Sequence, residues 1–215
     1  KAAGKGSICT LVTGRLFTHG HLSLLADDPS VAENAVAGMN VYIDKAHRLG
    51  ADIVLGWAKG NIPADGDRTE YLRRLAETLK ILDTTAGERG VKILIEVINH
   101  YETNLFNTAG ETLAFLEENH LDNCYIHLDT YHMGMEEGDP YEAIRLCGDR
   151  LGYFHVADNS RRYPGSGQFD FQKILATLSE IHYSGYVTVE CIPEPDRDTA
   201  AQKAIAHLRA CEPQA

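Results

Sequence analysis

The chain has 215 residues, of which 44% are hydrophobic and 24% are charged. This length and balance predict one folded domain with a sizeable core and argue against intrinsic disorder. Acidic residues outnumber basic ones by 31 to 20, giving a net charge of −11, so binding to nucleic acid phosphates or to anionic membranes is disfavoured.

Six runs rich in β-branched and aliphatic residues predict strands near residues 7–12, 52–56, 91–97, 124–129, 151–157 and 185–191. A helical pattern follows each run. The first shows a capping box from Ser30 to Glu33. Apolar stripes then recur at helical spacing, at Val36, Met39, Ile43 and Ala46 and again at Leu72, Leu75, Leu79 and Leu82. Gly50 and Gly90 follow these two helices, where a glycine commonly ends a helix.

Strands that alternate with helices, without hairpin signals, predict an α/β fold with a parallel sheet. Two architectures fit this pattern. We expect a (β/α)8 TIM barrel that lacks the first two βα units, so that residues 1–215 form a single, N-terminally incomplete barrel domain. The alternative is an open doubly wound sheet, which would bring fewer strand ends to one pocket.

The cysteine pattern and the N-terminal residues indicate in which part of the cell the protein is expected. The five cysteines are widely spaced and form no C-x-x-C pair, so neither a disulfide framework nor a zinc knuckle is predicted. The first residues lack the apolar stretch of a signal peptide, and no apolar run is long enough to span a bilayer. We therefore expect a cytoplasmic protein.

Acidic or imidazole side chains end four successive strand-like runs: Glu96, Asp129, His155 and Glu190. In a parallel barrel these ends face one mouth, so the four side chains would converge. A single carboxylate at a strand end is commonly a solvated or helix-capping group, but four at equivalent positions favour a metal site. Carboxylates with one imidazole suit Mn²⁺ or Mg²⁺ better than structural zinc, and Mn²⁺ is the expected ion.

Further polar residues fall in the predicted loops at the same mouth, among them Glu102, His132 and Arg161. Such loops carry the substrate contacts of barrel enzymes, although a hydrated rim is the simpler interpretation. The turn-rich segment 158–167 contains two glycines, but no helix begins directly after them. It is therefore interpreted as a loop rather than a phosphate cradle.

Four segments resemble the ketose 3-epimerase group, typified by D-tagatose and D-psicose 3-epimerases, of the xylose isomerase-like TIM barrel superfamily: residues 96–102 (EVINHYE), 127–133 (HLDTYHM), 154–162 (FHVADNSRR) and 186–190 (YVTVE). The resemblance implies a Mn²⁺ site, alternatively Co²⁺ or Mg²⁺, and a free ketose substrate in a homodimer or homotetramer. The implied metal ligands are Glu96, Asp129, His155 and Glu190.

The same resemblance implies that Glu96 and Glu190 are the catalytic acid/base pair and that Glu102, His132 and Arg161 bind the substrate. His100 departs from the pattern, because an arginine is common there. The implied reaction is epimerisation at C3 through an enediolate.

Several alternatives stay open at this point. An aldose–ketose or hydroxypyruvate-type isomerase would use the same enediolate chemistry, and an inactive fragment would bind metal or sugar without turnover. A metal-independent glycosidase is less favoured, because it would leave Asp129 and His155 without a role. An endonuclease IV-like enzyme would need more histidine ligands and a basic face.

Overall fold

The computed structural model describes residues 6–213. By their contacts the residues form two compact units, the first made of Lys1–Ile95 with Asn119–Cys124 and the second of Glu96–Glu118 with Tyr125–Ala215. In the part of the chain that the structure describes, no helix is both long and apolar enough to cross a membrane.

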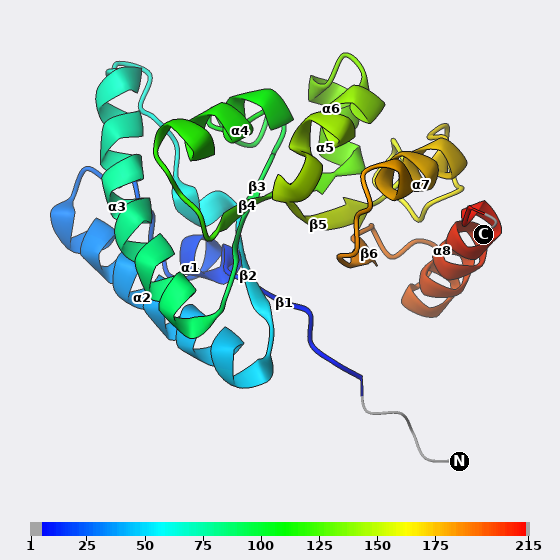
Figure 1. The fold of residues 1–215 in the computed structure, drawn as a ribbon, viewed down its shortest axis with the longest axis horizontal. Helices are drawn as coiled ribbons and strands as arrows, with labels where there is room; N and C mark the ends of the chain where they lie inside the picture. The colour runs from blue at the N-terminus through cyan, green and yellow to red at the C-terminus, as the bar shows by residue number, and fades with distance from the viewer. Residues whose placement is uncertain (1–5, 214–215) are drawn as a thin grey trace. The chain divides into compact units, whose positions relative to one another are not determined.

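The first unit is built from parallel strands joined by helices (Figure 1). Thr10 lies opposite Asp52, and Ile53 lies opposite Ile93. The elements are β1 (Thr10–Val12), α1 (Gly14–Thr18), α2 (Pro29–Leu49), β2 (Asp52–Leu55), η1 (Trp57–Lys59), α3 (Arg68–Arg89) and β3 (Ile93–Glu96), whose last residue belongs to the second unit.

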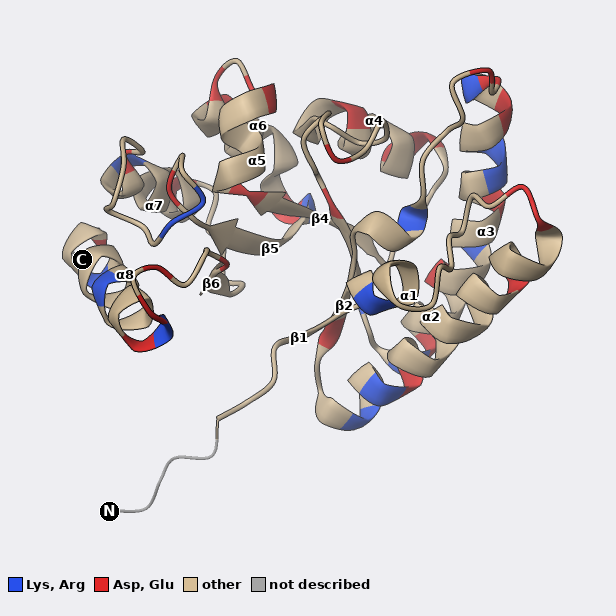
Figure 2. Cartoon of the chain, turned by 180° about the vertical axis from the view of Figure 1, so that it is seen from behind, with Lys and Arg blue, Asp and Glu red and all other residues tan. Residues whose placement is uncertain are grey.

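Both long helices of this unit begin at an aspartate and end at a glycine. The side chains of Asp28 and Asp67 accept hydrogen bonds from the backbone two residues on, and Gly50 and Gly90 adopt a left-handed φ of 63°. The predicted capping box was therefore misplaced, because Asp28, followed by Pro29 at the first helical position, is the cap instead of Ser30. Both helices carry mixed charges on their exposed surfaces (Figure 2).

The second unit repeats the same βα pattern. Its elements are α4 (Ala109–Glu118), β4 (Cys124–Asp129, with Cys124 in the first unit), α5 (Thr130–Glu136), α6 (Pro140–Cys147), η2 (Gly148–Arg150), β5 (Leu151–Val156), α7 (Phe171–Glu180), β6 (Val187–Val189) and α8 (Arg197–Cys211). Helix α6 packs against α4 and α7, and α7 packs against α8.

The strands of the second unit are parallel, with Asp129 opposite His155 and His155 opposite Thr188. Since side chains alternate along a strand, Ile126 and Leu128 point away from the face that His127 and Asp129 share. Aliphatic and aromatic side chains therefore fill one face of the strands, and the polar groups of the candidate site occupy the other.

All six predicted strands are present. The strand at 124–129 has the predicted bounds, the other five are one or more residues shorter than predicted, and the predicted parallel pairing is confirmed. The apolar stripes are also largely correct, although Ala35 is buried in place of Val36, and Tyr71 in place of Leu72. The two short helices α1 and α5 come in addition to the predicted ones.

Candidate metal centre

The structure brings together the four residues that end the strand-like runs. Glu96, Asp129, His155 and Glu190 each offer one donor atom, and these atoms all lie within 4.8 Å of one another. Glu96 and Asp129 are the last residues of β3 and β4, His155 is the last but one of β5, and Glu190 directly follows β6. All four belong to the second unit.

Asp129 uses its two carboxylate oxygens for different purposes. Oδ1 accepts the backbone N–H of Tyr131 at 2.8 Å and so caps α5. Oδ2 is buried, lies 3.9 Å from His155 Nδ1 and has no hydrogen-bond partner among the described residues. Burial raises the pKa of Asp129 to about 6, because a carboxylate loses its hydration there.

His155 and Glu190 form a close pair, with His155 Nδ1 3.4 Å from Glu190 Oε2. The close approach of the His155 imidazole lowers the pKa of Glu190 to about 2. Burial opposes a charge on His155, but the close Glu190 carboxylate and the charge of Asp129 raise the pKa of His155 above its ordinary value.

This donor set fits a divalent cation. Three carboxylates and one imidazole supply the oxygen-rich ligands that Mn²⁺ and Mg²⁺ prefer. The buried Oδ2 of Asp129, which lacks a hydrogen bond among residues 6–213, gains a partner when a cation sits beside it. Glu96, Asp129, His155 and Glu190 are therefore the residues that would hold the ion.

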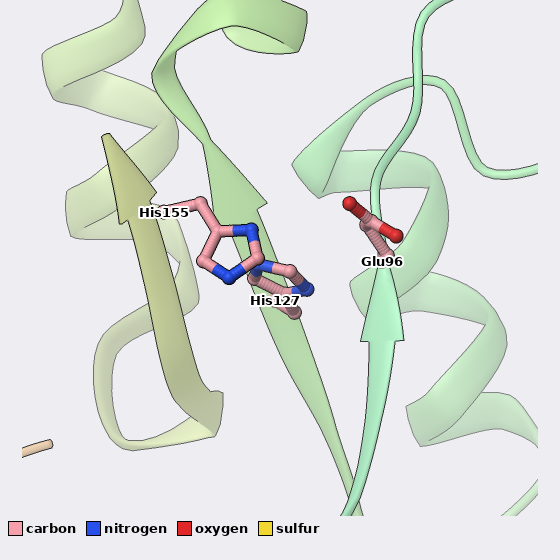
Figure 3. Close-up of side chains that lie close together, drawn as sticks. All are labelled: Glu96, His127 and His155. Atoms are coloured by element: carbon pink, nitrogen blue, oxygen red, sulfur yellow. The ribbon is translucent and has the colours of Figure 1, made fainter. Parts of the chain in front are cut away.

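Sequence reasoning missed a fifth candidate donor, His127. It groups with Glu96 and His155 within the same 4.8 Å limit, and Figure 3 shows the three side chains on β3, β4 and β5. Its ring is fully buried and meets the ring of His155 edge to face, with centroids 4.2 Å apart. The sequence did contain a signal for this residue. Side chains alternate between the two faces of a strand, so His127, two residues before Asp129, lies on the same face of β4.

Arg161 connects two of the acidic groups beside this centre. Its guanidinium lies 3.3 Å from Glu102 Oε1 and 3.3 Å from Glu190 Oε2, and it stacks over the ring of Tyr131 at 4.7 Å. Arg161 and Glu102 are each about a quarter exposed. Both side chains can therefore reach a molecule bound next to the four donors.

His132 lies in the first turn of α5, close behind Asp129, and is buried. Its Nδ1 lies 2.7 Å from the amide nitrogen of Asn99, which also donates to Glu102 Oε1 at 3.0 Å. The structure thus gathers Glu102, His132 and Arg161, the three predicted substrate-binding residues, around the donor cluster. His100 points elsewhere: it is half-exposed and pairs with Glu136.

The glycine-containing loop after β5 is organised around a buried carboxylate. Asp158 accepts backbone N–H groups of Asn159, Gly165, Gly167, Gln168 and Phe169 at 2.8–3.2 Å. A Cβ at Gly167 would lie 2.4 Å from Asp158 Oδ1, so only glycine allows this approach. These donors serve the protein's own carboxylate, which agrees with the interpretation as a loop.

Comparison with known proteins places this arrangement in a family. The family model described as xylose isomerase-like TIM barrel matches residues 5–211. The chain belongs to this family. The expected α/β barrel class is thereby confirmed, and the open doubly wound alternative is set aside.

Several relatives of the chain are sugar epimerases. The ketose 3-epimerase of Arthrobacter globiformis is 42% identical over 168 residues, which are 77% of this chain and 58% of that protein. Among solved structures, D-allulose 3-epimerase from Methylomonas sp. superimposes with a TM-score of 0.79 at 31% identity, covering 88% of this chain and 73% of that one.

A 3-keto-D-glucoside 4-epimerase from E. coli superimposes with a TM-score of 0.86 at 25% identity, covering 95% of this chain and 80% of that one. The xylose isomerase-like chain described here spans less than two thirds of the first curated relatives it matches.

Proposed function

We propose that this chain catalyses metal-dependent epimerisation of a free ketose at C3. The observation that carries the proposal is the convergence of Glu96 and Glu190, from different strands, with Asp129 and His155. The similarity to ketose 3-epimerases supports the substrate class. Mn²⁺ is the proposed ion, with Co²⁺ and Mg²⁺ as alternatives, because the donors are mostly oxygen atoms.

The reaction needs two proton carriers. The C3 hydrogen of a ketose lies next to the carbonyl and is weakly acidic, and inversion requires its removal from one face and the return of a proton to the other. In the proposed mechanism, one of Glu96 and Glu190 takes the C3 proton as a carboxylate, and the electron pair of the C–H bond delocalises toward the ketone to form an enediolate. The other glutamic acid then donates its proton to the opposite face of C3.

The remaining residues of the site bind and orient the sugar. In this proposal Arg161 and His132 donate to the oxygens of the carbonyl end of the sugar, and Glu102 accepts from a hydroxyl. A bound cation would supply Lewis-acid stabilisation of the negative charge on the enediolate oxygens. Carboxylates positioned as general acid and base contribute about 10²–10⁴-fold.

Product analysis tests the proposal. The chain is incubated separately with D-fructose, D-psicose, D-tagatose and a 3-keto-D-glucoside, with Mn²⁺ and after EDTA treatment, and the products are separated by chromatography. We expect C3 epimers with Mn²⁺ and none after chelation. An aldose product would instead favour an isomerase of the same family, and turnover of a 3-keto-glucoside at C4 alone would favour the activity named for the E. coli relative. Light scattering of the same sample tests the expected homodimer or homotetramer.

A further inference from the structure

Asn99 occupies a central place beside the candidate metal centre although it was not among the predicted substrate-binding residues. It follows Glu96 by three residues and is buried, with 1% of its surface exposed. Its backbone carbonyl accepts the N–H groups of Glu102 and Thr103 at 3.1 and 3.2 Å. Asn99 and Glu102 are thus held in one tight turn.

The hydrogen bonds determine which way the Asn99 amide faces. Its Oδ1 accepts the backbone N–H of Tyr101 at 3.0 Å. Because a backbone N–H can only donate, the atom that faces it must be the oxygen, and the amide nitrogen must face the other side. That nitrogen lies 3.0 Å from Glu102 Oε1 and 2.7 Å from His132 Nδ1.

An amide nitrogen carries two hydrogens and accepts no hydrogen bond. Toward Glu102 it donates one hydrogen to the carboxylate. Toward His132 it donates the other, and this bond forms only when Nδ1 is the unprotonated nitrogen of the ring. The proton of the neutral imidazole therefore sits on Nε2, the other nitrogen of His132.

We propose that Asn99 is a positioning residue that sets the tautomer of His132 and the direction of the Glu102 carboxylate together. His132 then carries its donor hydrogen on Nε2, and Glu102 carries a carboxylate acceptor. This combination suits the oxygens and hydroxyls of a sugar. This assignment rests on the proposed function for the identity of the ligand, whereas the tautomer of His132 is a property of the protein alone.

The test replaces the amide by an isosteric carboxylate, Asn99→Asp. This change removes the donor toward His132 Nδ1 and places an acceptor there, so His132 carries a proton on Nδ1, either as the Nδ1–H tautomer or as the imidazolium with both nitrogens protonated. The matched control is Asn107→Asp, because the Asn107 amide donates to Ile98 O at 2.7 Å and Thr103 O at 2.9 Å in the same loop. The control disturbs that loop while leaving the bond from Asn99 to His132 in place.

The tautomer is read in the metal-free protein by long-range ¹H–¹⁵N correlation NMR of the ten histidines, with His132 assigned by loss of its signals in His132→Gln. We expect Nε2–H in the wild type and in Asn107→Asp, and Nδ1–H in Asn99→Asp. Circular dichroism of each variant shows whether it is folded.

Kinetics supply the second reading. We expect Asn99→Asp to raise KM for the ketose and lower kcat/KM by about 10²-fold, as for other losses of substrate orientation, while the Mn²⁺ affinity stays unchanged. An Nδ1–H tautomer in the wild type, or a ring without a proton on Nδ1 in folded Asn99→Asp, would overturn the assignment. If the tautomer switches as expected but the wild type turns over no ketose, the tautomer assignment stands and the proposed function fails.

Discussion

His155 Nδ1 lies 3.4 Å from Glu190 Oε2, so an imidazole and a carboxylate from the ends of neighbouring strands form a pair at the edge of the candidate metal centre. The pair stabilises the ionised form of Glu190, whose pKa is lowered to about 2, so that Glu190 stays ionised even in mildly acidic solution. An ionised Glu190 is ready either to bind a cation or to accept a proton, and both roles are part of the proposed function.

Replacing Glu96 or Glu190 by glutamine tests the acid/base pair. The amide keeps the shape of the side chain but cannot carry the proton, so exchange of the C3 hydrogen with solvent deuterium is expected to stop, and turnover to fall by about 10²–10⁴-fold. Proton NMR of the ketose in D₂O measures the exchange. Because both residues are also expected metal ligands, each variant is assayed at saturating Mn²⁺. Exchange retained in both variants would refute the assignment.

Metal affinity should depend on pH. A cation requires Asp129 and His155 without their competing protons. The pKa of Asp129 is raised to about 6, and that of His155 is raised above its ordinary value. As the pH falls through about 6, Asp129 becomes protonated in the metal-free protein, so the apparent Mn²⁺ affinity is expected to fall, approaching about tenfold per pH unit for one competing proton.

Isothermal titration calorimetry between pH 5.5 and 8 measures this dependence. Repeating each titration in two buffers with different ionisation enthalpies gives the number of protons released on binding. We expect a release that increases as the pH falls toward 6. A Mn²⁺ affinity that is constant over this interval would contradict the ligand roles of Asp129 and His155.

The donor cluster could be predicted because its geometry follows from the fold class. In consecutive parallel strands, equivalent end positions meet at one edge. Asp129 is the last residue of its predicted strand and Glu96 and Glu190 are the last but one of theirs, and a shift of one residue in those predictions does not alter the conclusion. The spacing of strands and helices thus carried most of the information about the site.

Other features depend on details that the sequence pattern does not display. The Asn99 side chain is positioned by a turn in which the Asn99 backbone carbonyl accepts two N–H groups. The Asp158 carboxylate binds five backbone N–H groups that come together only in the folded loop. His127 lies inside a strand and resembles any buried core residue until its neighbours are known. Contacts set by loop conformation therefore remained beyond the sequence prediction.

The role of His127 can be tested with His127→Phe, which keeps an aromatic ring of similar shape against His155 but removes both nitrogens. If His127 supplies a donor, affinity should fall by about 10–100-fold, the usual cost of losing a group that supports a metal site. The loss should be larger for Co²⁺ and Zn²⁺ than for Mn²⁺, because imidazole suits those ions better.

The control for this change is His207→Phe. His207 also packs edge to face on an aromatic ring, that of Phe171 at 5.6 Å, but it is not part of the donor cluster. Competition with a chromophoric chelator gives the three affinities for each variant. Equal affinities in His127→Phe and the wild type would show that His127 only packs.

Asp158→Asn tests whether the loop after β5 positions Arg161. The backbone N–H of Arg161 donates to the backbone carbonyl of Asp158 at 2.7 Å. Asp158 therefore holds the loop through its carboxylate and also holds the turn that ends at Arg161 through its carbonyl. An asparagine has one acceptor oxygen, and its NH₂ group would face backbone N–H donors. We expect a loss of about 1–3 kcal/mol in the free energy of unfolding, a higher KM for the ketose and an unchanged Mn²⁺ affinity.

Asp170→Asn provides the comparison, because Asp170 caps α7 by accepting one N–H, that of Lys173, at 2.9 Å. Asparagine caps helices about as well as aspartate, so this variant should keep the wild-type stability and KM. Urea denaturation and steady-state kinetics on both variants separate the two cases. The positioning role of Asp158 requires that KM rise in Asp158→Asn under conditions where the variant is fully folded; a wild-type KM there would mean that the loop holds Arg161 without the carboxylate.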